Sequence, residues 1–236
     1  MGRIFEKRKY KMFARYDRMA KAFTKIGREI AIAVRTGGTD PAHNPRLRMA
    51  VQNAKGVNMP KDRVEAAIHR AAAKDASGFE EVLYEGYAPH GIAVMIECAT
   101  DNPNRTIANL RHIFRDGGAS IGNSGSVAFL FERKGVTKVK ASAIVDPDAV
   151  ELELIDHGLE DFEKIDDEYV LTSSFENFGK LHRALESLKV EAISSELHYL
   201  PTVRKELPED QAKQVLEFIE SVEADEDVQA VHHNLQ

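Results

Sequence analysis

Lysine and arginine side chains crowd the first third of the chain, and their spacing suits the binding of a polyanion. Residues 1–74 carry 18 basic and 6 acidic side chains, a net charge of +12, whereas the whole chain of 236 residues has a net charge of −6. Each phosphate that such a side chain neutralises releases condensed counterions, which favours binding. We predict that nucleic-acid phosphates contact Lys7, Arg8, Lys9, Lys11, Arg15, Arg18, Lys21, Lys25, Arg28, Arg46, Arg48, Lys55, Lys61 and Arg63.

Three aromatic residues, Tyr10, Phe13 and Tyr16, lie between these cations. Their rings could stack on exposed bases, or they could pack into a helical bundle. The cations could likewise form an ordinary solvated helix face. We favour nucleic-acid contact for the lysines and arginines and leave both interpretations of the aromatic residues open.

The motifs of enzymes are absent or incomplete in this sequence. The segment Gly122-Asn123-Ser124-Gly125-Ser126 has the outline of a nucleophile elbow, G-x-S-x-G, but Ser126 replaces the second glycine. Neither the dinucleotide-binding G-x-G-x-x-G nor a Walker phosphate loop occurs. His232 and His233 are adjacent on an expected strand, where neighbouring side chains point to opposite faces and do not share a metal ion. The sequence therefore predicts a protein that is not an enzyme, with neither a cofactor, a metal site nor a small-molecule substrate.

Two glycine-containing loops, 84–91 and 117–126, flank the same predicted sheet. Glycine permits close approach of the backbone, so either loop could offer amides to a phosphate, although turn formation explains both more simply. Asp101, Asn102 and Asn104 fit the start of a helix as capping residues. Arg105 follows in the first turn and is a further candidate phosphate ligand.

Composition also excludes several classes of protein. No run reaches the roughly 18–20 apolar residues that span a bilayer, and the first residues lack the apolar region of a signal peptide. The single cysteine, Cys98, cannot form an intramolecular disulfide, which fits a reducing compartment. It lies in an apolar run and is expected to be a buried strand residue. We predict a cytoplasmic protein without a membrane partner.

Apolar residues repeat at helical spacing in the first 75 residues. Those that recur every three or four positions are Met19, Phe23, Ile26, Ile30 and Val34. Gly37-Gly38 is expected to end this helix, a second helix should begin at Asn44-Pro45, and a third at Pro60. Residues 3–15 show little periodicity, so we expect a flexible or loosely helical tail there. The pattern predicts a bundle of three helices.

The remaining chain predicts mixed strands and helices. Strands are expected at 82–87, 92–98 and 127–131, with a helix between Pro103 and Gly117. From residue 136 the expected order is strand 136–140, helix 147–157, strand 161–165, strand 168–173, helix 175–188 and strand 191–199. This β-α-β-β-α-β order is that of a ferredoxin-like unit.

A helix at 208–223 and a strand at 228–234 complete the expected elements. Because one helix and one strand cannot form a domain alone, they should return to the sheet that begins near residue 80. We therefore predict an α+β protein, with an N-terminal three-helix bundle followed by two α+β units, the second ferredoxin-like and inserted in the first. The expected domains are residues 1–75, residues 76–135 together with 201–236, and residues 136–200.

Acidic side chains dominate the rest of the chain. Residues 75–236 carry 14 basic and 32 acidic residues, a net charge of −18. Eleven carboxylates fall within residues 146–168, where Lys164 is the single lysine or arginine. Such a run is usually a solvated acidic face, although it could also bind a protein partner.

Seven short motifs occur in order along residues 20–236. They are Ala22-Phe23-Thr24-Lys25-Ile26-Gly27-Arg28-Glu29-Ile30, Asn44-Pro45-Arg46-Leu47-Arg48, Asn58-Met59-Pro60-Lys61-Asp62, Tyr84-Glu85-Gly86-Tyr87, Thr100-Asp101-Asn102-Pro103-Asn104-Arg105-Thr106, Gly125-Ser126-Val127-Ala128-Phe129-Leu130-Phe131 and Asp227-Val228-Gln229-Ala230-Val231. Together they resemble the YebC/PmpR family of transcriptional and translational regulatory proteins.

This resemblance implies a helical N-terminal domain and two α+β domains, one inserted in the other. It also implies one of two roles. Family members are generally described as cytoplasmic DNA-binding transcriptional regulators, whereas others, including the mitochondrial relative that activates cytochrome oxidase translation, act on the ribosome. Neither role needs a cofactor. Many members open with Gly-His-Ser-Lys-Trp, whereas this chain has Gly2-Arg3-Ile4-Phe5 and no tryptophan, so the contacts of that stretch are not carried over.

The sequence thus predicts a nucleic-acid-binding regulator, a DNA-binding transcriptional regulator first of all, that docks through its basic N-terminal domain. Two alternatives stay open. The chain could be a ribosome-associated translation factor that contacts ribosomal RNA, because its acidic remainder would be repelled by a long duplex. It could also be a protein-interaction module that acts through its acidic domain.

Overall fold

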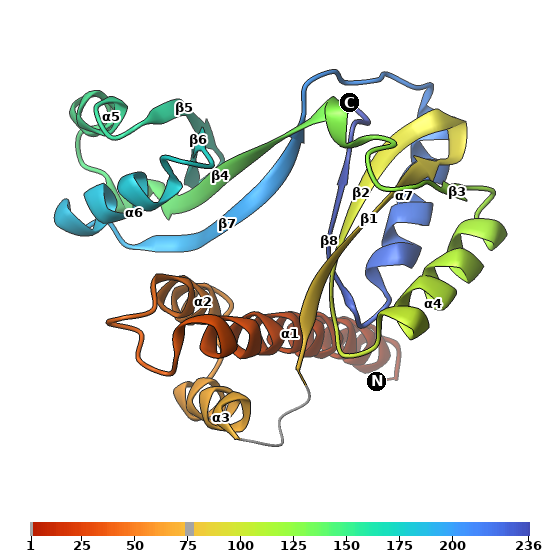
Figure 1. Ribbon diagram of the computed structural model, residues 1–236, viewed down its shortest axis with the longest axis horizontal. Coiled ribbons are helices and arrows are strands. Elements are labelled where there is room, and N and C mark those ends of the chain that lie inside the picture. Colours follow the sequence, from red (N-terminus) through yellow and green to blue (C-terminus); the bar gives the residue numbers. More distant parts are fainter. Residues whose placement is uncertain (1, 74–77) are drawn as a thin grey trace. The chain divides into compact units, whose positions relative to one another are not determined.

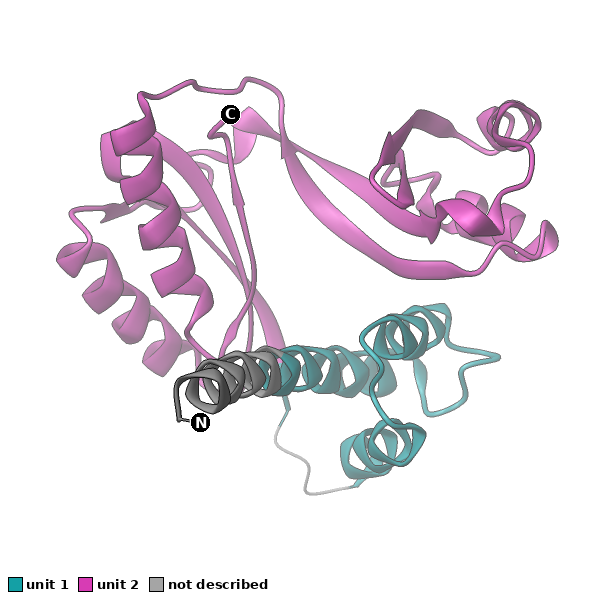
Figure 2. Ribbon diagram, turned by 180° about the vertical axis from the view of Figure 1, so that it is seen from behind, with its two compact units in different colours: residues 1–79 teal, residues 80–236 magenta. Residues whose placement is uncertain are grey.

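The computed structural model describes the backbone of residues 2–73 and 78–236 and the side chains of residues 19–73 and 78–236. The chain divides into two compact units, residues 1–79 and residues 80–236, which are coloured separately in Figure 2. The first unit is helical and the second contains two four-stranded sheets. This confirms the predicted α+β class, in which helices precede the sheet units.

Unit 1 consists of α1 (Gly2–Gly37), α2 (Pro45–Gly56) and α3 (Lys61–Ala72), as Figure 1 shows. Its core joins all three helices, since Ile30 and Leu47 are completely buried and Val64 is nearly so. The predicted helix boundaries near Gly37, Pro45 and Pro60 are confirmed. Residues 3–15, for which we expected a flexible or loosely helical tail, fall within the bounds of α1.

Asn44 joins the end of α1 to the beginning of α2. Its side-chain oxygen accepts a hydrogen bond from the Leu47 N–H (3.0 Å), which caps α2. Its amide group donates to the backbone oxygens of Ala33 (2.7 Å) and Gly38 (2.8 Å). Because Asn44 is buried and fully engaged in these bonds, it fixes the turn between the two helices.

The first sheet of unit 2 has the strand order β3-β1-β2-β8, and every neighbouring pair is antiparallel. Its strands are β1 (Glu80–Ala88), β2 (Ile92–Thr100), β3 (Ser120–Ile121) and β8 (Val228–His233), with η1 (Pro89–Gly91) as a short 3-10 helix between β1 and β2. Helices α4 (Pro103–Asp116) and α7 (Glu209–Glu223) cover the same face of this sheet (Figure 1). Phe114 of α4 and Phe218 of α7 meet edge to face in this core, with their ring centroids 5.0 Å apart.

The second sheet has the strand order β5-β6-β4-β7, again antiparallel throughout. Its elements are β4 (Phe131–Lys140), η3 (Ala141–Ala143), α5 (Pro147–Ile155), β5 (Leu159–Ile165), β6 (Glu168–Ser174), α6 (Phe178–Ser187) and β7 (Ala192–Pro201). This is the predicted ferredoxin-like β-α-β-β-α-β order, placed between β3 and α7 of the first sheet. The exact division into residues 76–135 with 201–236 and residues 136–200 stays a prediction.

The predicted strand at 127–131 is wrong. Ala128–Leu130 form a 3-10 helix, η2, and β4 begins only at Phe131. The backbone N–H groups of Val127 and Ala128 donate to the carboxylate of Glu85, at 2.8 and 2.9 Å, so they are not available to a strand ladder. A buried acidic side chain therefore replaces the pairing that the apolar sequence suggested.

Candidate nucleic-acid interface

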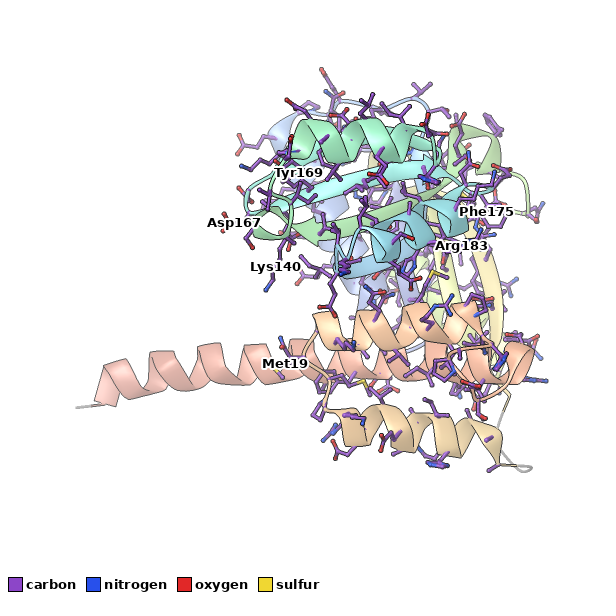
Figure 3. The ribbon with its side chains drawn as sticks, turned by 90° about the vertical axis from the view of Figure 1, so that its left-hand side faces the viewer. Met19, Lys140, Asp167, Tyr169, Phe175 and Arg183 are labelled. Atoms are coloured by element: carbon purple, nitrogen blue, oxygen red, sulfur yellow. The ribbon has the colours of Figure 1, made fainter. Side chains whose placement is uncertain are left out.

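The basic side chains of unit 1 come from all three helices. Among residues 19–73, whose side chains the structure describes, 10 are lysine or arginine and 4 are aspartate or glutamate. Lys21, Lys25 and Arg28 follow one another at spacings of four and three on α1, which places them on one side of that helix. Figure 3 shows the side chains of this unit from Met19 onward. The part of the positive charge that lies within residues 19–73 therefore comes from lysines and arginines of the three helices.

The exposed members of this set lie on α1, α2 and α3. Lys21, Lys55, Lys61 and Arg63 are exposed, whereas Lys25, Arg28, Arg46 and Arg48 are half-buried. Lys61 lies 3.5 Å from Glu65 across one turn of α3, and its side chain is 91% exposed. Such a surface pair contributes little to stability, so it leaves the ammonium group accessible to a phosphate.

Several of the arginines also have a structural role. The guanidinium carbon of Arg28 lies 5.2 Å from the ring centroid of Phe79, and that of Arg63 lies 5.8 Å from the ring centroid of Phe23. These distances are typical of cation–π contacts, which stabilise the pair while the charge remains. Arg48 donates to the backbone oxygen of Pro41 (3.3 Å). The fold therefore positions these arginine side chains, and they keep their positive charge.

The remaining predicted contacts of the N-terminal segment lie outside the described side chains. They are Lys7, Arg8, Lys9, Lys11, Arg15 and Arg18, together with the aromatic residues Tyr10, Phe13 and Tyr16. Both interpretations of the aromatic residues therefore stay open.

Arg105 has carboxylate partners within its own chain. Its Nη2 donates to Asp101 Oδ1 (2.9 Å) and to Asp227 Oδ2 (2.9 Å). The hydrogen bond to Asp227 is the largest influence that raises the pKa of Arg105 above its ordinary value. A phosphate would have to compete with both carboxylates for this guanidinium group, so the geometry points to a structural role, and the phosphate role stays a prediction.

Asp227 is the centre of a buried polar cluster. It is almost completely buried and accepts hydrogen bonds from the hydroxyl groups of Thr106 (2.7 Å) and Thr100 (3.2 Å), in addition to Arg105. Thr106 also contacts Thr100, with their hydroxyl oxygens 2.8 Å apart. The cluster joins the end of β2 and the first turn of α4 to the residue before β8. These hydrogen bonds offset the free-energy cost of burying the Asp227 carboxylate away from water.

Glu85 is a buried acidic residue that the sequence interpretation missed. Its carboxylate accepts three backbone N–H groups, from Gly125 (2.7 Å), Val127 (2.8 Å) and Ala128 (2.9 Å). Burial alone would raise the pKa of Glu85, but these three donors outweigh burial, and the net pKa is lowered below its ordinary value. The signal in the sequence was an acidic residue inside an apolar strand, together with a glycine-rich loop that carries spare amides.

The two glycine-containing loops therefore have explanations within the fold. At Gly86 a Cβ atom would lie 2.5 Å from the backbone oxygen of Ser120, so only glycine fits where β1 meets β3. Gly118 and Gly125 have φ angles of +68° and +85°, which favour glycine. Three amides of the second loop already bind Glu85. The simpler interpretation of these loops, turn formation and close packing, accounts for what the structure shows.

The cysteine and the described metal-ligating side chains are the other residue types that could carry chemistry. Cys98 is buried in the core of the first sheet, as predicted. Within the described residues, histidine, cysteine, aspartate and glutamate side chains form no group of three or more that could hold a metal ion. Within the same residues, the helices are all too short or too polar to cross a membrane.

Comparison with known proteins decides the family. The family model described as "TACO1/YebC protein N-terminal domain" matches residues 3–74, and that described as "TACO1/YebC second and third domain" matches residues 79–235. The chain belongs to the TACO1/YebC family. The predicted resemblance is thereby confirmed, and the two matched ranges correspond closely to the two compact units.

Relatives of this TACO1/YebC protein carry a regulatory name. Proteins from Anaeromyxobacter dehalogenans and Myxococcus xanthus, 54% and 49% identical, are each named "Probable transcriptional regulatory protein", and each alignment covers all of both chains. A crystal structure of a conserved hypothetical protein from Aquifex aeolicus is 37% identical, with a TM-score of 0.82 over 92% of this chain and 90% of that one. These names support a regulatory role for this member of the family.

The motifs of the TACO1/YebC family meet in pairs inside unit 2. The motif that contains Glu85 binds the motif that begins at Gly125, and the motif that contains Thr106 binds the one that begins at Asp227. In the described part of the chain, these polar motif residues are engaged with each other. Their spacing is therefore explained by folding, whereas Lys61, in a basic motif of unit 1, has a side chain that is 91% exposed.

Proposed function

We propose that this TACO1/YebC protein is a nucleic-acid-binding regulator that contacts the phosphates of DNA with its basic helical unit. The observation that carries the proposal is the segregation of charge. Residues 1–74 have a net charge of +12, and residues 1–79 form a compact unit of their own. A positive surface on a unit of its own attracts a polyanion through the cations of that unit.

Recognition in this proposal is directed at the backbone of the nucleic acid. Asparagine and glutamine commonly read adenine, but among those of unit 1 Asn44 and Asn53 are buried and Gln52 is half-buried, which leaves Asn58 as the exposed one. Lysine and arginine on helical surfaces are suited to phosphate contacts, which position a protein without reading sequence. We therefore expect a small preference between DNA sequences.

Ribosomal RNA is a second candidate target, and the charge of the second unit favours it. Residues 75–236 have a net charge of −18, which opposes binding along a long duplex. A ribosomal site could present phosphates to the basic helices and basic protein surfaces to the acidic remainder. The names of the relatives favour transcription, so DNA is the first target to test.

The test is a competition experiment with the full chain. Labelled random duplex DNA is bound first, and unlabelled duplex DNA or a ribosomal RNA fragment is then titrated in. Displacement by duplex DNA at equal or lower concentration than by RNA supports the proposal. Displacement at a much lower RNA concentration, together with co-sedimentation with ribosomes after DNase digestion, assigns the protein to translation. A chain that binds neither polyanion at about 100 mM salt contradicts both targets.

A further inference from the structure

Helix α5 (Pro147–Ile155) of the second sheet presents apolar side chains on two opposite sides. Leu154 is completely buried and Val150 packs against the same core. Leu152 and Ile155, three positions apart and therefore on a common side of the helix, are 71% and 53% exposed. Val145, just before the helix, is 99% exposed. A helix that covers a sheet normally has a polar outer side, so the exposed pair of Leu152 and Ile155 departs from that pattern.

Carboxylates surround this exposed apolar surface. Asp148 is exposed and lies one turn before Leu152, and the half-buried Glu151 lies one turn before Ile155. The segment that holds the helix and the following hairpin, residues 146–168, contains eleven carboxylates and Lys164 as its single lysine or arginine. The backbone oxygen of Asp167 in that hairpin, labelled in Figure 3, accepts a hydrogen bond from the Ala141 N–H (2.8 Å) just after β4. The acidic residues are thus concentrated in the segment that contains α5 and the β5–β6 hairpin.

We infer that the outer side of α5 is a docking surface for a positively charged protein segment that carries apolar side chains on one face. Leu152 and Ile155 would bury against these apolar side chains, and the surrounding carboxylates would pair with lysine or arginine. This inference goes beyond the proposed function, since it concerns a different unit of the chain and a protein ligand.

The charge of the surface selects this occupant. Nucleic acid and anionic lipid are both repelled by the carboxylates, so neither would cover Leu152 and Ile155. A basic segment gains from charge complementarity, which raises the association rate and fixes the orientation of the bound segment. A basic amphipathic helix fits both features of the surface. Its apolar face would pack on Leu152 and Ile155 while its lysine or arginine side chains pair with the neighbouring carboxylates.

The first test measures binding of a defined probe to the full chain. The probe is a fluorescent amphipathic helical peptide of about 20 residues, with lysine on one face and leucine on the other. The control peptide has glutamate in place of each lysine. We expect the lysine peptide to bind and the glutamate peptide to fail. The variant Leu152→Gln/Ile155→Gln should bind the lysine peptide at least about tenfold more weakly. Leu216→Gln, at a 52% exposed position of α7, is the matched control and should stay within about twofold.

The second test separates charge from apolar contact. Asp148→Lys/Glu151→Lys should weaken peptide binding strongly, whereas Asp210→Lys/Glu220→Lys on α7, with the same change in net charge, should weaken it much less. Circular dichroism confirms that each variant keeps its helices. Equal losses for the α5 and α7 variants, or a wild-type chain that does not bind the lysine peptide, would overturn the inference. A third outcome is that the wild-type chain self-associates and does not bind the peptide, and that Leu152→Gln/Ile155→Gln abolishes the self-association. This outcome would overturn the inference of a basic segment and assign the surface to a second copy of the chain.

Discussion

The carboxylate of Glu85 accepts a hydrogen bond from the backbone N–H of Val127 at 2.8 Å, although 42 residues separate them. The same oxygen accepts the Ala128 N–H, and the other carboxylate oxygen accepts that of Gly125. This one side chain holds the turn that leads from β3 into the long strand β4. It thereby fixes the point at which the ferredoxin-like unit leaves the first sheet.

Replacing this carboxylate should destabilise unit 2. Glu85→Gln keeps the shape of the side chain but replaces one acceptor oxygen by an NH₂ group that faces backbone donors. Hydrogen bonds to charged groups are worth about 1.5–3 kcal/mol, so we expect the free energy of unfolding to fall by about 2–3 kcal/mol. Urea denaturation at pH 7 measures this fall. Glu80→Gln, an exposed change on the same strand, is the control and should have almost no effect.

The same variant predicts a dependence on pH. The pKa of Glu85 is lowered from its ordinary value of 4.5 in the folded chain, so the carboxylate stabilises the fold above that value. This stabilisation is lost as the pH falls through the folded-state pKa, because the unfolded chain binds the proton more readily. The difference between wild type and Glu85→Gln should therefore be constant from pH 7 to about pH 5.5 and shrink below pH 4.5. A difference that stays constant to pH 3 would show that the charge of Glu85 does not stabilise the fold.

The cluster around Asp227 gives a second stability prediction. Asp227→Asn removes the charge that Arg105 faces at 2.9 Å, and places an amide where Thr100 and Thr106 donate. We expect a loss of about 2–3 kcal/mol in the free energy of unfolding, because a buried charged acceptor is removed. Glu220→Gln, on the exposed side of α7, serves as the control. If both variants unfold at the same urea concentration as wild type, the cluster has no stabilising role.

Glycine positions offer a third prediction with opposite signs at two sites. In Gly86→Ala the new methyl group would meet the Ser120 backbone oxygen at 2.5 Å and a ring carbon of Phe114 at 2.9 Å. We expect a loss of about 1–3 kcal/mol from this overpacking. In Gly179→Ala, in the first turn of α6, nothing lies within 4 Å of the new atom, so the lower conformational freedom of alanine in the unfolded chain should stabilise the fold by about 0.4–1 kcal/mol. Thermal unfolding of both variants checks the two signs together.

Much of the fold could be predicted from the sequence because its signals are local. The apolar repeat that includes Ile26 and Ile30, and the Asn44-Pro45 cap, are read within one or two helical turns, and the helices that they predict are present. The β-α-β-β-α-β order followed from the same kind of local pattern. The predicted strand at 127–131 failed because its backbone donors bind Glu85, a contact over some forty residues that no local pattern contains.

Some features of the candidate site could likewise be predicted from local sequence, and others could not. Clustered lysine and arginine are visible in the sequence itself, so the basic surface of unit 1 could be predicted. The role of Arg105 could not be judged locally, since one of its two carboxylate partners, Asp227, lies 122 residues away. The exposed apolar side of α5 was also hidden, because Leu152 and Leu154 look equivalent in the sequence and only the fold shows which of them is buried.

The central claim is that the basic N-terminal unit binds nucleic-acid phosphates, and the salt dependence of binding tests it most directly. The dissociation constant for a random DNA duplex is measured between 50 and 200 mM salt for wild type and for Lys7→Glu/Arg8→Glu/Lys9→Glu/Lys11→Glu. The account predicts weaker binding and a slope of log K against log salt that is reduced by about 0.9 for each lost phosphate contact.

The matched control carries the same change in net charge on the second unit, Lys180→Glu/Arg183→Glu/Lys189→Glu/Lys213→Glu. The account predicts that this control keeps the wild-type slope and most of the affinity. A slope that is unchanged in the N-terminal variant, or that falls equally in the control, would contradict the claim that these residues form the nucleic-acid interface.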